Sequence, residues 1–521
     1  MDKIREEVRL VIAIALSLLI VFAFGKFRAP QKQIGQETPP VVLTEDISDT
    51  PLEQKVVLPI SVKKTGEDKV YEDNRYIIEY NSAGGAIKNI GIKQYTRANE
   101  AALNIFDGSD LLLAYSADKP EEVGNVYSSI IKEKTLHFQN ISENILIEKV
   151  IDIPSEDYTF TTAINFTNKG RESHTLKNYA LSTGTLFTSG VRKGYRDREF
   201  VPPEIIIKSN KKVFKINTAR STKSAVYTNT EWIALKQRYG MVFMRPESPQ
   251  KSFITVLSDN NGTNIAINTG FSYDDIEVLA GETKSIKFSF YAGPSDYFAA
   301  KSQVTEREVF GTGFFAAMGR FLFLALSYIH RLIPNWGWAI IILTLIVKAV
   351  FFPLTRKSLR SMKALQKLRP YLQDVQKKYK DNPQQMQKEL MSLYKEYNIN
   401  PFGGCLPMFI QFPIFIGFFI ALRNSVFLRG APFILWIQDL SVADTLVRIS
   451  GFPINLLPII MAAASFYQQR LTPQEPSQKA MTYMMPIMFL FLFYNFSSGL
   501  LLYWTTMNIA GVVEQYYVHK K

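Results

Sequence analysis

The sequence predicts a polytopic α-helical membrane protein that also carries a large all-β domain. Apolar runs of about 20 residues, the length that crosses a bilayer as a helix, occur at the start of the 521-residue chain and repeatedly in its last third. Between residues 56 and 296, apolar and polar residues instead alternate, as in TFTTAINFTN (159–168) and TKSIKFSFYAGP (283–294). This alternation is typical of strands, and the intervening turns NSAGG, TNKG and DNNGTN predict a β-sandwich.

The positive charge is concentrated in one segment. The formal net charge is +13, and between Arg356 and Asn400 there are 11 Lys and Arg against 4 Asp and Glu, a surplus of +7. Such a block can bind nucleic acid. Apolar runs flank this one on both sides, however, which favours a cytoplasmic loop and no specific nucleic-acid sequence as partner.

Residues for catalysis or metal binding are not evident. Cys405 is the only cysteine, which excludes an internal disulfide, and the four histidines show no ligand spacing. We therefore expect no metal, no cofactor and no catalytic residue.

The N-terminal half begins with an expected membrane anchor at 1–28, whose span is about 8–24. It follows a charged start and has no convincing small-residue cleavage site. A Pro- and Thr-rich linker is expected at 29–55 and the periplasmic β-sandwich at 56–296, which is large enough for a core. A docking or scaffold role is the simplest expectation for this domain, and carbohydrate binding or processing is an alternative.

The run FFAAMGRFLFLALSYI (314–329) has Arg320 at its centre. As a span it would place the basic segment outside the cytoplasm, so we expect interfacial helices at 297–333 instead. The tract from about Ala480 to Val513 would be roughly 50 Å long as one helix, too long for one crossing. The break NFSSG (495–499) is expected to divide it. Spans after the β domain are then expected at 334–355, 404–428, 453–470, 480–495 and 498–517.

The connections between these spans alternate in location. We expect a cytoplasmic helical hairpin at 356–402, a periplasmic loop at 429–452, a cytoplasmic loop at 471–479 and a cytoplasmic tail at 518–521. Six spans with both termini in the cytoplasm satisfy the positive-inside rule.

Apolar residues recur every three or four positions on both sides of Asp381-Asn382-Pro383, which predicts the two helices of the hairpin. Pro370 is expected to kink or restart the first. The hairpin either packs on itself near anionic headgroups or offers a docking surface to a ribosome, targeting factor or nascent chain. Candidate residues for that surface are Arg360, Lys363, Lys367, Lys377 and Lys378.

Lys348 stands within the apolar run IILTLIVKAVFFPLT (341–355). It lies about 18 Å along the helix from Trp336 and about 12 Å from Arg356. A charge at this depth either snorkels to the inner interface or faces a wet cavity in the bundle. Its candidate polar neighbours in the spans are Thr344, Gln411, Trp504 and Asn508. Because no second buried charge is recognised, we expect a single positive charge there, which argues against an ion path.

Four motifs resemble those of the YidC/Oxa/Alb membrane protein insertases. They are LRPYLQDVQKKY, MSLYKEYNINPFGGCLPMFIQFPIF, APFILWIQDLS and SGLLLYWTTMN, and the resemblance covers roughly residues 330–515. The β domain, which ends in YAGP (291–294), resembles that of the bacterial YidC type.

The resemblance implies a five-helix core around a hydrophilic groove that is open to the cytoplasm and the lipid, and a β-supersandwich for the outer domain. It also implies insertion and folding of nascent membrane proteins in the bacterial inner membrane, alone or with the Sec translocon. The family has no nucleotide hydrolysis of its own, so we expect an insertase or chaperone and not an enzyme.

Several residues can be matched to the family pattern. Thr344 and Trp504 match positions that contact substrate. Lys348 stands where the family has arginine, and Ser497 where a proline would precede SGL, so the break between the last two spans is expected to be softer. A transporter or channel, and an assembly factor that works through its β domain, remain alternatives.

Overall fold

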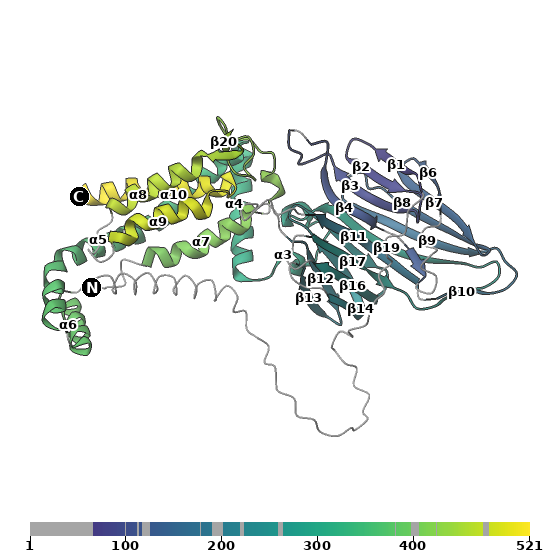
Figure 1. The fold of residues 1–521 in the computed structure, drawn as a ribbon, viewed down its shortest axis with the longest axis horizontal. Helices are drawn as coiled ribbons and strands as arrows, with labels where there is room; N and C mark the ends of the chain where they lie inside the picture. The colour runs from purple at the N-terminus through teal and green to yellow at the C-terminus, as the bar shows by residue number, and fades with distance from the viewer. Residues whose placement is uncertain are drawn as a thin grey trace, which may run out of the picture. The chain divides into compact units, whose positions relative to one another are not determined.

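The computed structural model describes residues 66–520 except 99, 112–113, 117–125, 178, 190–201, 219–222, 259–263, 381, 398–405, 424 and 472–478. Figure 1 draws an all-β region followed in the chain by helices. The expected anchor at 1–28 and the linker at 29–55 lie outside the described residues.

Antiparallel strands build the β domain. They are β1 (Asp68–Glu72), β2 (Tyr76–Asn81), β3 (Ala86–Ile92), β4 (Leu103–Leu111), β5 (Ala114–Ser116), β6 (Ser128–Lys132), β7 (Thr135–Ser142), β8 (Ile145–Asp152), β9 (Thr159–Asn168), β10 (His174–Leu176), β11 (Tyr179–Ser189), β12 (Glu204–Ser209), β13 (Lys212–Asn217), β14 (Lys223–Lys236), β15 (Gly240–Pro246), β16 (Gln250–Ser258), β17 (Asn264–Ser272), β18 (Ile276–Val278) and β19 (Thr283–Pro294). Apart from the separate pair β10–β18, all of them belong to one hydrogen-bonded sheet.

Two layers of this sheet face each other. Tyr76 and Tyr80 of β2 make edge-to-face ring contacts with Phe160 of β9 and Phe138 of β7, at 5.6 and 5.5 Å between ring centres. β2 is hydrogen-bonded to β1 and β3 and not to β7 or β9, so these ring contacts connect the two layers across the core. One buried apolar cluster fills the space between them. The chain therefore has the all-β sandwich that the sequence predicts.

In β9 and β19, the apolar residues that alternate with polar ones in the sequence are the residues that are buried. In β9, Phe160, Ile164 and Phe166 are buried on one face. In β19, Phe288 and Phe290 are buried, and Phe290 is paired in register with Phe160 and stacked on it at 4.7 Å. Because successive side chains of a strand point to opposite faces, this pattern sets which face of each strand meets the core.

The helical part follows the β domain. Its elements are α2 (Tyr297–Ala300), α3 (Arg307–Phe310), α4 (Phe314–Leu332), α5 (Trp336–Lys378), α6 (Pro383–Glu396), α7 (Leu406–Arg423), η3 (Val426–Leu428), the hairpin β20 (Thr445–Ile449) and β21 (Phe452–Asn455), α8 (Leu456–Leu471), α9 (Lys479–Phe493) and α10 (Ser498–Lys520). Each of the five expected core spans thus contains a helix, and a non-helical break separates α9 from α10 as predicted.

Of the described helices, only Trp336–Ala364 is both long and apolar enough to cross a membrane by itself. Shorter apolar helical stretches occupy Gln411–Arg423 and Met484–Phe493. Six crossings therefore stay a prediction.

α5 differs from the prediction. We expected a span that ends at residue 355 and a helix that kinks or restarts at Pro370, but one helix of 43 residues runs through Pro353 and Pro370. Leu359, Leu368 and Leu372, which flank the second proline, are buried. Each proline costs one backbone hydrogen bond, yet the helix is continuous, so the expected restart at Pro370 was wrong. A helix can continue beyond the bilayer, so the end of the span at residue 355 stays a prediction.

The helix α4 is the longest of the three helices in the segment 297–333, where we expected interfacial helices. Leu322, Phe323 and Leu326 are buried in the helical core, whereas Phe321 and Tyr328 on other faces are exposed. Arg320, the charge at its centre, donates to the carbonyl oxygen of Gly311 at 2.8 Å. The exposed face is therefore largely apolar, and the position of α4 at the outer interface stays a prediction.

Candidate substrate groove

Lys348 forms an ion pair in the helical core. Its Nζ, on α5, lies 2.8 Å from Oε2 of Glu514 on α10, and the two side chains are 17% and 5% exposed. The sequence had predicted a single charge without a buried partner, and this was wrong. Glu514 follows the apolar run IAGVV and precedes QYYVHK, so its sequence context predicts a polar residue at an interface. Only the packing of α10 against α5 shows that it is buried.

The other four predicted groove residues have different neighbours. Thr344, one turn before Lys348, is fully buried, and its hydroxyl donates to the carbonyl oxygen of Ile340 in the same helix at 2.6 Å. The amide of Asn508 donates to the carbonyl oxygen of Met461 on α8 at 3.5 Å. Gln411 lies partly buried on α7. Within the described part of the chain, none of these four is hydrogen-bonded to Lys348.

Trp504 belongs to an aromatic cluster between three helices. Its ring centre lies 4.7 Å from that of Phe415 on α7, and 5.5 and 4.7 Å from those of Phe489 and Phe493 on α9. Trp504 lies ten residues before Glu514 on α10, about 15 Å along the helix axis. Of the predicted set, Lys348 thus belongs to an ion pair and Trp504 to an aromatic cluster, and the other three residues belong to neither.

The segment 429–455, between η3 and α8, is hydrogen-bonded to the break between α9 and α10. The hydroxyl of Ser498 donates to the carbonyl oxygen of Asp439 or Val442, at 2.8 and 2.7 Å. The side-chain amide of Asn455, Nδ2, donates to the backbone carbonyl oxygen of Tyr494 at 2.7 Å. The loop therefore binds the chain on both sides of Ser497, where we had expected a softer connection for want of a proline.

Asp444 in the same loop caps α8. One of its carboxylate oxygens, Oδ2, accepts hydrogen bonds from the backbone amides of Leu456 and Leu457 at 3.0 and 2.6 Å, and from Nε1 of Trp436 at 3.1 Å. Burial raises the pKa of Asp444 although these hydrogen bonds oppose the shift. The carboxylate satisfies helix N-terminal amides that have no partner within the helix.

The basic hairpin is built as its sequence predicts around the turn. Asn382 caps α6 by accepting from the amide of Gln385 at 3.2 Å, and Pro383 is the first residue of the helix. The rings of Tyr371 and Tyr397 lie 6.0 Å apart between the two helices. Of the predicted docking residues, four are exposed and Lys363 is partly buried; the exposed ones are Arg360, Lys367, Lys377 and Lys378.

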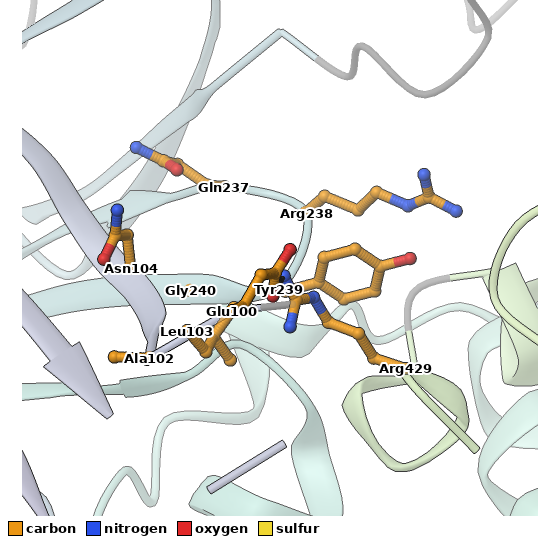
Figure 2. Close-up of a pocket in the computed structure, with 9 residues that line it drawn as sticks. All are labelled: Glu100, Ala102, Leu103, Asn104, Gln237, Arg238, Tyr239, Gly240 and Arg429. Atoms are coloured by element: carbon orange, nitrogen blue, oxygen red, sulfur yellow. Dashed lines mark hydrogen bonds and ion pairs between the residues drawn. The ribbon is translucent and has the colours of Figure 1, made fainter. Parts of the chain in front are cut away.

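Ion pairs join the β domain to the loop at 429–444, and Figure 2 draws Glu100 and Arg429 of one of them. Arg429, only 8% exposed, pairs with Glu100 and donates to the carbonyl oxygen of Tyr95 at 2.7 Å. Nε of Arg97 lies 2.8 Å from Oδ2 of Asp439. Arg429 and Glu100 line a cavity of about 320 Å³ together with Tyr239. Because the carboxylates here are paired with guanidinium groups, the arrangement favours attachment over general acid–base chemistry.

In the described ranges, no group of three or more His, Cys, Asp or Glu side chains is placed to hold a metal ion.

Comparison with known proteins first defines the class. Residues 328–521 match the family described as 60Kd inner membrane protein, and residues 72–325 match the YidC periplasmic domain. The chain is thus an inner-membrane protein with a β-sandwich domain.

Individual relatives then identify the family. A membrane protein insertase YidC from Geobacter sp. strain M21 is 30% identical over 473 residues, which cover 87% of this chain and 86% of the relative. One from Endomicrobium trichonymphae is 37% identical over 297 residues, 56% of each chain. The crystal structure of an active YidC insertase with its first transmembrane domain resolved is 19% identical, covers 88% of this chain and 94% of that chain, and has a TM-score of 0.39. The chain belongs to the YidC family of membrane protein insertases.

Proposed function

We propose that this protein inserts and folds nascent membrane proteins in the bacterial inner membrane, alone or with the Sec translocon, and without hydrolysing a nucleotide. Membership of the insertase family supports the activity. The observation that supports the site is the cation of Lys348, which is mostly buried among the core helices beside α10. A buried charge of this kind in a membrane segment marks a functional position by default.

The proposed mechanism lowers the cost of moving polar chain through hydrocarbon. Each backbone group without a hydrogen bond costs several kcal/mol there. A partly hydrated groove around Lys348, Thr344, Gln411, Trp504 and Asn508 removes part of that cost. Its positive charge attracts acidic stretches, which must cross, and disfavours basic stretches, which must stay in the cytoplasm.

The proposed topology has six spans, both termini in the cytoplasm and the β domain in the periplasm. The exposed basic residues of α5 and α6 then face the cytoplasm, where they suit a ribosome, a targeting factor, a nascent chain or anionic headgroups. The ion pairs of Arg97 and Arg429 support attachment of the β domain to the outer loop as its role.

The test is insertion of a single-span substrate with an acidic N-terminal tail into proteoliposomes. We expect Lys348→Arg to insert about as well as the wild type, Lys348→Gln less and Lys348→Glu least, because the charge at this position falls in that order. Lys132→Gln, which removes an exposed lysine of β6, is the matched control. Equal insertion by all Lys348 variants contradicts the proposed site.

One observation favours a second function. The pair Lys348–Glu514 supplies the second buried charge that an ion path would need. A steady flux of small ions through liposomes that contain the protein would favour a channel or transporter over an insertase.

A further inference from the structure

The carboxylate of Glu514 lies on the buried face of α10. Tyr503 and Met507, which precede it by eleven and seven residues, are close to whole turns away at 3.6 residues per turn and therefore share its face. They are 1% and 5% exposed and belong to the helical core. An acid on such a stripe is costly unless it is paired.

The ion pair with Lys348 provides a partner for only one of the two carboxylate oxygens of Glu514. Oε2 of Glu514 lies 2.8 Å from Nζ of Lys348. The other oxygen, Oε1, is buried and accepts no hydrogen bond from any described residue. A pair that served stability alone would be expected to have both oxygens satisfied, because an unsatisfied buried acceptor costs free energy.

The two partners are not equally accessible. Lys348 is 17% exposed and Glu514 is 5% exposed. An ammonium group has three donors, and one salt bridge does not use them all. A second carboxylate can therefore approach the lysine from the accessible side while Glu514 remains behind it.

We propose that Glu514 is an internal counter-ion that competes with acidic side chains of the incoming chain for Lys348, and so sets how strongly the groove selects by charge. This inference rests on the proposed insertase function. Before substrate arrives, the groove holds a neutral pair. An acidic side chain of the substrate must share or displace Glu514, so the preference for acidic over neutral tails is weaker than Lys348 alone would give.

The experiment measures a ratio in proteoliposomes that contain the full chain. Two single-span substrates differ at one tail position, Asp in one and Asn in the other, and the ratio of their insertion yields is the readout. We expect Glu514→Gln to raise the Asp/Asn ratio about fivefold or more, the scale of coupling between competing ligands. In Lys348→Gln/Glu514→Gln the ratio should fall to about one, because neither charge remains.

The matched control is Glu133→Gln, which removes an exposed carboxylate in the turn between β6 and β7 and should keep the wild-type ratio. A ratio in folded Glu514→Gln that is equal to or below that of the wild type overturns the inference. Failure of the wild type to insert either substrate instead overturns the proposed function.

A second variant keeps an ion pair between α5 and α10, so that the test does not depend on a variant that leaves one buried charge unpaired. Lys348→Glu/Glu514→Lys retains opposite charges on α5 and α10 but makes the more accessible member acidic. We expect its Asp/Asn ratio to fall below that of the wild type. An unchanged ratio means that the pair only joins the two helices, and it also overturns the inference.

Discussion

At the scale of single residues, Lys149 of β8 shows how the β domain accommodates a charge in its core. It is completely buried, and its ammonium donates to the carbonyl oxygens of Gly84 and Gly85 at 2.6 and 3.3 Å. Both glycines have positive φ, 73° and 53°, a conformation that turns the chain between β2 and β3. Burial lowers the pKa of Lys149 to about 7.

Lys149 should make the stability of the β domain depend on pH. Its ordinary pKa is 10.5, so between pH 7 and that value the unfolded chain binds more protons than the folded one. The free energy of unfolding of the wild type should therefore rise with pH in this range, by up to about 1.4 kcal/mol per pH unit. Below pH 7, Lys149 is charged in both states, so the folded state bears the full cost of burying the charge. Lys149→Met should lose this slope in thermal unfolding of the full chain at pH 6, 7.5 and 9.

The slope is the readout because the methionine variant also leaves two carbonyl groups without their donor. Lys132→Met, which removes an exposed lysine of β6, should keep the slope of the wild type. Parallel curves for Lys149→Met and the wild type would show that Lys149 does not titrate in this range.

Lys348 and Glu514 show what the sequence can and cannot predict at this scale. The apolar run around Lys348 predicts a membrane-spanning helix, and the constant rise per residue of a helix then gives the distance of Lys348 from each end of the run. The partner is not predictable in this way, because Glu514 is distant in the chain and reaches Lys348 only through the packing of α10 on α5.

At the scale of elements, Asp444 should hold the start of α8 to the loop at 429–444. Asp444→Ala removes three hydrogen bonds and leaves the indole N–H of Trp436 without its acceptor. We expect a loss of about 1–3 kcal/mol in the free energy of unfolding, the range for a lost cap together with a partly buried donor that loses its acceptor. Hydrogen exchange at the amides of Leu456 and Leu457 should become faster.

Asp444→Asn is the control for this prediction. An asparagine caps helices about as well as an aspartate, so exchange at both amides should stay close to that of the wild type. Fast exchange in the asparagine variant, or slow exchange in the alanine variant, would contradict the role of the cap.

Local patterns predicted particular elements whose one face is buried. Phe160, Ile164 and Phe166 of β9 alternate in sequence and lie in the core, and Asn382-Pro383 opens α6 as its capping chemistry requires. The prediction failed for α5. Pro370 is a local signal for a break, but the helix runs through it, and Leu368 and Leu372 on either side of it are buried.

At the scale of the whole molecule, insertion should survive removal of the β domain. The proposed groove residues all lie on α5, α7 and α10, so deletion of residues 60–290 should leave measurable insertion in proteoliposomes. The same deletion takes away Glu100 and Arg97, the partners of Arg429 and Asp439. We therefore expect a lower melting temperature of the helical part, because a buried charge loses its partner.

Arg429→Gln in the deletion variant should recover part of that melting temperature, since it removes the unpaired charge. Loss of all insertion on deletion, in a protein that still folds, would instead favour an assembly factor that works through its β domain.

The continuous helix α5 connects the Lys348–Glu514 pair to the basic hairpin. Lys348 and Lys378 stand on one helix, about 45 Å apart along its axis. The two prolines between them each remove a backbone hydrogen bond and are the points at which such a rod bends most easily. We therefore expect a displacement of the hairpin formed by α5 and α6 to change the separation of α5 from α10 at the Lys348–Glu514 pair, reduced by any bending of α5 at the two prolines.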